Sequence, residues 1–106
     1  MADRLRPLLR WEAGLIPLLI EHLAAGVKTD SDGDWRTRLA ELGGDIRRVA
    51  LAHRGVADVV LRSGATGPQA LRLADAILGA LEDAGLDPDD AQDAYDVFLT
   101  YVLGSA

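Results

Sequence analysis

The chain has 106 residues, of which 49% are hydrophobic and 26% are charged, with 17 acidic residues against 11 basic residues. That length suits a single domain spanning residues 1–106, and the apolar fraction is too high for a disordered chain. The sequence contains no cysteine, which excludes disulfides, thiolate zinc sites and thiol nucleophiles.

Apolar residues recur with helical spacing along nearly the whole chain, and no stretch alternates long enough to predict a strand. We therefore expect an all-α fold, an antiparallel bundle of five helices, or six if the first is divided. The first helix is expected over residues 3–25. Pro17 removes a backbone donor and Gly14 eases bending, so a kink is expected near Ala13.

A second helix is predicted from about Asp34 to His53, with Asp34 among the candidate N-caps. Its apolar stripe recurs at spacings of three and four residues, through Trp35, Leu39, Leu42, Ile46, Val49 and His53. Gly43 and Gly44 each cost roughly 1 kcal/mol of helix propensity relative to alanine. They indicate the close approach of another helix, or less commonly of a ligand.

Three further helices complete the expected bundle. A short apolar helix covers residues 56–61, and a fourth helix begins at Pro68 and ends at Gly85. The fifth helix follows Asp87, which can serve as its N-cap. From Ala94 onward its apolar residues occupy every side, so both faces require burial, and a monomer of this size can hardly cover both. This pattern predicts a homodimer.

Charge is distributed unevenly along the chain. All the basic residues precede residue 73, whereas residues 73–106 carry eight acidic side chains and no basic one. Because such a segment cannot hold phosphates, no direct binding of nucleic acid is expected. The acidic residues over 82–96 could attract a cationic ligand, although most should form a solvated face.

No membrane or export signal is recognisable. The longest uncharged apolar run, residues 13–20, is shorter than the roughly 20 residues that a membrane-spanning helix needs. The first residues lack the pattern of a signal peptide. We therefore expect a cytoplasmic protein without membrane contact.

A metal site is not expected. Asp30, Ser31, the following acids and Glu41 reproduce the spacing of a calcium-binding loop. However, Trp35 occupies the position where that loop requires glycine, so a helix-capping loop is favoured over calcium. No cofactor is expected either.

The candidates for proton transfer are few. His22 and His53 lie on or beside apolar stripes, where a hydrogen-bonded structural histidine is the commoner case. His53 is the better ligand candidate because it ends the second helix beside a glycine. Ser63, Thr66 and Ser105 lack a histidine and a carboxylate at motif spacing, so a hydrolase triad is unsupported.

Several segments resemble the C-terminal regulatory domain of the tetracycline-repressor (TetR) family. They are residues 33–36 (GDWR), 52–55 (AHRG), 84–91 (AGLDPDDA) and the ending around Tyr95 and 101–104 (YVLG). The resemblance covers roughly residues 20–106. It implies an all-helical domain that binds a small-molecule effector and dimerises through a four-helix bundle.

The sequence also departs from that family's plan. No helix-turn-helix reading domain is recognised before Asp34, and the family usually continues beyond the equivalent of Ala106. Dimerisation would therefore use helices four and five. The magnesium-linked histidine of the tetracycline-binding members corresponds to Val60, so a magnesium–tetracycline complex is not the expected ligand.

These observations predict an effector-binding and dimerisation domain of a transcriptional regulator, with a hydrophobic small molecule held among the first, second and fourth helices. The residues expected to bind it are Trp35, Leu39, Leu42, Ile46, His53, Val60, Leu78, Tyr95 and Phe98. Those expected at the dimer interface are Leu71, Leu78, Leu81, Val97, Tyr101 and Val102.

Two alternatives stay open at this point. One is a small helical enzyme, for example a cyclase of a polyketide-like substrate, with His53, Asp58 and Tyr95 in acid–base roles. The other is a partner-binding helical bundle, which would present a large apolar face and no cavity.

Overall fold

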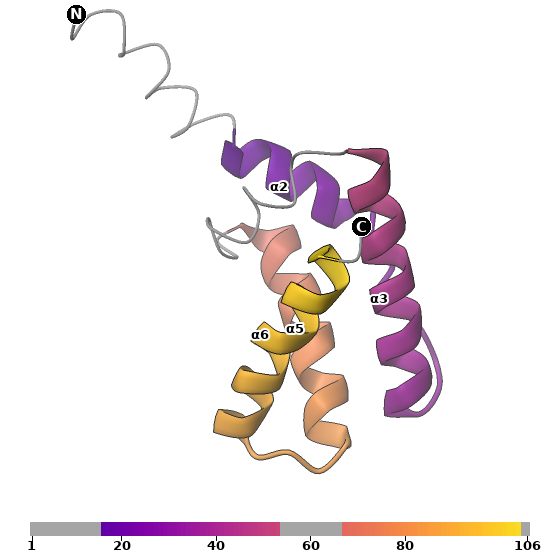
Figure 1. Ribbon diagram of the computed structural model, residues 1–106, viewed down its shortest axis with the longest axis vertical. Helices are drawn as coiled ribbons and strands as arrows, with labels where there is room; N and C mark the ends of the chain where they lie inside the picture. The colour runs from indigo at the N-terminus through magenta and orange to yellow at the C-terminus, as the bar shows by residue number, and fades with distance from the viewer. Residues whose placement is uncertain (1–15, 54–66, 105–106) are drawn as a thin grey trace, which may run out of the picture.

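The computed structural model describes residues 16–53 and 67–104, and these form four helices (Figure 1). In chain order they are α2 (Ile16–Ala25), α3 (Trp35–Ala52), α5 (Pro68–Asp83) and α6 (Pro88–Gly104). The all-α prediction is confirmed, whereas five or six helices are not shown. The expected helix over 56–61 and the expected kink near Ala13 lie outside the described residues.

The four helices pack as a compact bundle. Helices α5 and α6 are joined by a short turn and run side by side, α3 packs against both, and α2 crosses the far end of α5 (Figure 1). No helix in the described part of the chain is both long and apolar enough to cross a membrane.

Local signals in the sequence set the helix ends. Asp34 caps α3, because its Oδ1 accepts a hydrogen bond from the Thr37 backbone nitrogen at 2.8 Å. Asp87 does the same for α6, accepting from the Asp90 backbone nitrogen at 2.8 Å. Gly85 follows α5 with a φ of 102°, a conformation that favours glycine. The predicted ends of α3 and α5 and the predicted start of α6 are confirmed to within about two residues.

The N-terminus of α5 is capped from another helix. Its N-cap residue, Gly67, has no side chain to offer. Instead, the Glu21 carboxylate on α2 accepts hydrogen bonds from the backbone nitrogens of Gln69 at 2.9 Å and Ala70 at 2.7 Å. A carboxylate there also complements the helix dipole. This contact fixes α2 against α5.

In a second polar contact between the same two helices, α5 supplies the side chain, and the end of α2 with the residues that follow it supplies the acceptors. The Arg72 guanidinium on α5 donates to the backbone oxygens of Ala24 at 3.2 Å and Val27 at 3.1 Å, and to the Thr29 hydroxyl. These carbonyls lie at the C-terminal end of α2, where cations are favoured. Glu21 and Arg72 together set the position of α2 over α5.

The core lies where α3, α5 and α6 meet. Its buried members are Val27, Leu42, Ile46, Ile77, Leu81, Ala91, Val102 and Leu103. Ile77 is completely buried. A smaller apolar cluster of Ile20, Ala24 and Ala70 joins α2 to α5. No polar or charged side chain is buried within the described ranges.

The glycine pair in α3 marks a close approach at one of its two positions. A Cβ atom at Gly43 would lie 3.3 Å from Phe98 Cζ and 3.4 Å from Val102 Cγ2, whereas a Cβ at Gly44 would meet nothing within 4 Å. The predicted approach of another helix is therefore confirmed for Gly43, which faces α6. Gly44 faces open space.

This difference predicts opposite effects of one substitution at adjacent positions. We expect Gly43→Leu to lower the free energy of unfolding by about 1–3 kcal/mol, because the new side chain overpacks the contact with Phe98. Gly44→Leu should raise it by a few tenths to about 1 kcal/mol through helix propensity alone. Urea denaturation at matched protein concentration measures both, and equal effects at the two positions would contradict this packing.

Candidate ligand-binding cavity

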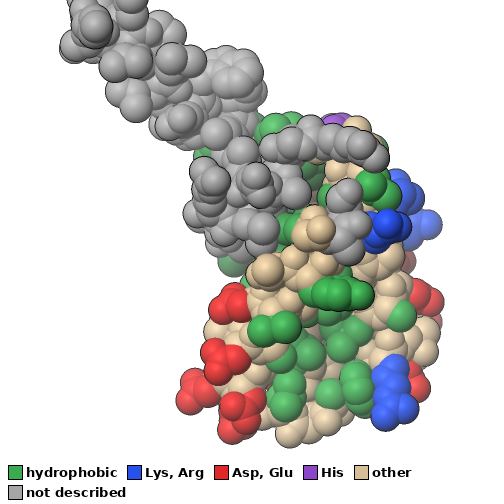
Figure 2. Space-filling model, in the orientation of Figure 1, with side chains coloured by type: hydrophobic (Ala, Val, Ile, Leu, Met, Phe, Trp, Pro, Cys, Tyr) green, Lys and Arg blue, Asp and Glu red, His purple; other side chains and the backbone are tan. Residues whose placement is uncertain are grey.

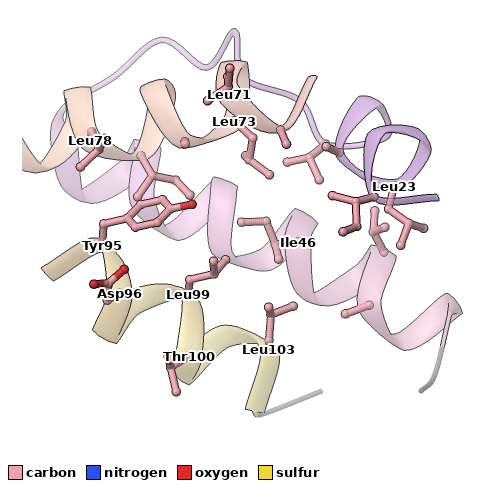
Figure 3. A pocket seen from close by; sticks show the side chains of 18 of the residues that line it. Leu23, Ile46, Leu71, Leu73, Leu78, Tyr95, Asp96, Leu99, Thr100 and Leu103 are labelled. Atoms are coloured by element: carbon pink, nitrogen blue, oxygen red, sulfur yellow. The ribbon is translucent and has the colours of Figure 1, made fainter. Parts of the chain in front are cut away.

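A cavity of about 650 Å³ lies between the four described helices (Figure 3). This volume falls within the range of small-molecule sites, roughly 300–1,000 Å³. Its lining residues are mostly aliphatic and come from every described helix: Ile20, Leu23, Ala24, Val27, Ile46, Val49, Ala50, Ala70, Leu71, Leu73, Ala74, Ile77, Leu78, Gln92, Tyr95, Asp96, Leu99, Thr100 and Leu103.

Small side chains on facing helices leave this space unfilled. Ala24 on α2, Ala50 on α3, and Ala70 and Ala74 on α5 all line the cavity. Each contributes only a methyl group, so these positions fill less of the space than longer aliphatic side chains would. A space lined this way suits an apolar molecule, because its walls offer few hydrogen-bond partners that could hold a water molecule.

Helix α6 places one stripe of side chains in the cavity. Tyr95, Leu99 and Leu103 are spaced four residues apart and so project from the same face. Figure 3 shows the Tyr95 ring reaching from α6 into the space between the helices, with its hydroxyl directed into that space. Tyr95 therefore brings a polar group into an otherwise aliphatic interior.

The Tyr95 hydroxyl is suited to contact a ligand. Burial raises the pKa of the Tyr95 phenol, and the neighbouring Asp96 carboxylate raises it further. The phenol therefore stays protonated at neutral pH and can donate a hydrogen bond. No group of residues 16–53 or 67–104 hydrogen-bonds to it.

A second stripe of α6 forms part of the cavity rim. Gln92, Asp96 and Thr100 also follow a four-residue spacing, line the cavity and are exposed to solvent. Leu71 on α5, 53% exposed, lies at the rim as well. Asp96 is the single charged side chain among the described residues of the lining.

The structure places three of the predicted ligand-binding residues at the cavity, namely Ile46, Leu78 and Tyr95. Leu42 and Leu39 instead pack into the core that α3 forms with its neighbours. Val60 lies outside the described residues.

The other three predicted ligand-binding residues are elsewhere. Phe98 packs against Gly43 on the α3–α6 contact. Trp35 begins α3 and carries the Arg36 guanidinium 5.0 Å from the centre of its ring. His53 is exposed at the C-cap of α3. These positions do not line the cavity found among the described helices.

The residues predicted at the dimer interface divide into three groups. Val97 and Tyr101 are 70% and 74% exposed, and Leu71 is exposed too. Leu81 and Val102 are only 7% and 6% exposed, because they fill the core of their own chain. Leu78 is half-buried and lines the cavity.

The predicted acid–base set is not assembled in the described chain. Tyr95 lines the cavity, His53 is exposed away from it, and Asp58 lies outside the described residues. The other histidine, His22, is exposed on α2. Ser63, Thr66 and Ser105 lie outside the described residues.

The segment with calcium-loop spacing acts as a helix-capping loop. Glu41 lies within α3 and accepts a hydrogen bond from the Ser31 hydroxyl. Within residues 16–53 and 67–104, no three acidic, histidine or cysteine side chains gather as a metal site would require.

The first predicted helix, which includes α2, is expected at the ligand site, but no residue of α2 is among those predicted to bind the ligand, and the rim of α6 is not predicted either. The missed lining residues include Ile20, Leu23, Leu99 and Leu103. The sequence feature that could have indicated these α6 residues is a pair of neighbouring stripes, each with a four-residue spacing. Tyr95, Leu99 and Leu103 form the apolar stripe, and Gln92, Asp96 and Thr100 form the polar one.

The four described helices around an apolar cavity define a small all-α domain with a candidate ligand site. Residues 28–106 match the tetracyclin repressor-like C-terminal domain, and the chain belongs to this family. The resemblance seen in the sequence is thereby confirmed.

One solved structure supports the same assignment. The crystal structure of a possible TetR family transcriptional regulator from Streptomyces coelicolor A3(2) is 37% identical to this chain, with a TM-score of 0.73. The match covers 85% of this chain and 46% of the regulator, so the chain spans about half the length of that protein. No protein of curated function matches the chain.

Proposed function

We propose that this chain is the effector-binding and dimerisation domain of a TetR-type transcriptional regulator, acting in the cytoplasm. The observation that carries the proposal is the cavity of about 650 Å³, with an aliphatic lining and one inward-directed phenol. Burial of apolar surface contributes about 25 cal/mol per Å², which supplies the affinity. The hydroxyl of Tyr95 orients the ligand through one hydrogen bond.

The exposed face of α6 supports dimerisation. Val97 and Tyr101 project their apolar surface into solvent on this helix. Packing the α5–α6 pair of one copy against that of a second copy would cover these side chains in a four-helix bundle. Such a symmetric interface is the commonest arrangement of homo-oligomers.

Helix α6 connects the two activities. One of its faces lines the cavity through Tyr95 and Leu99, and another carries Val97 and Tyr101. A ligand that shifts α6 would therefore also shift the surface on which the second copy packs. Small helix movements at subunit interfaces are an established way of coupling sites.

A matched pair of probes tests ligand binding at Tyr95. We expect wild-type protein to bind 1-naphthol roughly two- to tenfold more tightly than naphthalene, because only 1-naphthol pairs with the phenol. Tyr95→Phe should remove this preference and leave the affinity for naphthalene nearly unchanged. Isothermal titration calorimetry measures both affinities.

Tyr101→Phe is the control, because Tyr101 lies on the exposed face of α6 and does not line the cavity. This variant should keep the preference for 1-naphthol. Failure of wild-type protein to bind either probe, or to gain thermal stability from them, would contradict the proposed function.

A further inference from the structure

Among the described residues, the rim of the cavity carries a negative charge without a positive partner. Asp96 lines the rim and is exposed, and no lysine, arginine or histidine lines the cavity in the part of the chain described. The salt bridges of that part join Arg38 to Asp83 and Arg48 to Asp45, and neither involves Asp96.

The surroundings of Asp96 strengthen this negative field. The acidic residues on and near α6 are exposed: Glu82, Asp87, Asp89, Asp90, Asp93 and Asp96, together with Asp83, which is paired with Arg38. In Figure 2, acidic side chains gather over α6, while the basic ones lie on the side toward α3 together with further acidic ones. A concentration of one sign of charge attracts ligands of the other sign.

The polar atoms at this rim are also suited to accept hydrogen bonds. Gln92 offers a side-chain carbonyl oxygen, Thr100 offers a hydroxyl oxygen, and Asp96 offers two carboxylate oxygens. Their four-residue spacing places them along one line on α6. A protonated amine has donors but no acceptor, so it fits this set, whereas a carboxylate ligand would be repelled.

We propose that the cavity selects lipophilic cations, with the apolar body of the ligand between the helices and its ammonium group at Asp96. This inference rests on the proposed effector-binding function and adds the chemical class of the effector. Asp96 sets the charge preference, and the aliphatic walls supply the greater part of the affinity.

Three probes with the same ten-carbon chain test the charge preference: decylammonium and decanoate, each below its micelle-forming concentration, and 1-decanol, below its solubility limit. Titration calorimetry with the whole chain at pH 7 and low salt measures their affinities. We expect wild-type protein to bind decylammonium roughly two- to fivefold more tightly than 1-decanol, the range for a solvent-exposed ion pair. Decanoate should bind more weakly than 1-decanol.

In Asp96→Asn, the affinity for decylammonium should fall to that for 1-decanol, and the affinity for 1-decanol should stay the same. Asp93→Asn is the matched control, because it removes the same charge from an exposed position of α6 that does not line the cavity. It should keep most of the preference for decylammonium. Added salt should reduce the ratio between the affinities of the wild-type protein for decylammonium and for 1-decanol, because it screens the exposed charges.

The outcomes separate this inference from the proposed function. If all three probes bind equally, or if Asp93→Asn and Asp96→Asn lower the preference alike, the selection by Asp96 is overturned while the apolar site stands. Tighter binding of decanoate than of decylammonium would also overturn the selection by Asp96. Absence of binding by all three probes would overturn both the charge preference and the effector-binding site.

Discussion

Replacing Ile77 with alanine should lower the free energy of unfolding by about 2–5 kcal/mol. Ile77 is the one completely buried large side chain in the described ranges, and it packs in the core shared by α3, α5 and α6. Small domains have a total stability of about 5–15 kcal/mol, so this loss is large. Ile77→Val removes a single methylene and should cost about 0.5–1.5 kcal/mol.

The same side chain lines the cavity, which makes the effect of Ile77→Ala depend on ligand. The variant enlarges the cavity, so naphthalene should bind it and restore part of the lost stability. Leu42→Ala is the matched control, because Leu42 is also buried, with 3% of its surface exposed, but does not line the cavity. Thermal unfolding with and without naphthalene, at matched protein concentration, measures the difference.

Similar recovery in both variants would show that naphthalene does not occupy the space beside Ile77. A loss below about 1 kcal/mol for Ile77→Ala would contradict the packing described for the core.

Removing the Glu21 carboxylate should also lower the free energy of unfolding substantially. Glu21→Ala leaves the backbone nitrogens of Gln69 and Ala70 without their partner, which should cost about 1.5–3 kcal/mol for hydrogen bonds to a charged group. Hydrogen exchange should show faster exchange of these two amides. Glu82→Ala, an exposed position on α5, is the control and should change stability by less than about 0.5 kcal/mol.

A double-mutant cycle with Gly67 sharpens this test. A Cβ atom at Gly67 would overlap the side chain of Glu21, so Gly67→Ala should displace the carboxylate and lose stability like Glu21→Ala. The double variant should be much less destabilised than the sum of the two single variants, because both disrupt the same contact. Additive losses would show that Glu21 does not cap α5.

The helix ends could be predicted from the sequence because their causes are local. Asp34 and Asp87 cap their helices within three residues, and Gly85 adopts the conformation that ends α5. The Glu21 cap could not be predicted in this way, because Glu21 contacts backbone groups 48 and 49 residues away. No local pattern encodes such a partner.

The candidate site was predicted less completely than the fold. Leu42 and Ile46 belong to one apolar stripe of α3, yet only Ile46 lines the cavity. The stripe is wide enough to face both the cavity and α6, and periodicity cannot divide it. For the same reason, the all-round apolar pattern of α6 could not separate the buried Val102 from the exposed Tyr101.

Ligand-to-methyl NMR contacts show most directly whether an apolar molecule binds between α2, α3, α5 and α6. With methyl-labelled protein and 1-naphthol, we predict nuclear Overhauser effects to Ile46, Ile77 and Leu99, which line the cavity. Val97, on the exposed face of α6, should show none. Contacts confined to Val97 and other surface methyl groups, or no contacts at all, would contradict binding in the cavity.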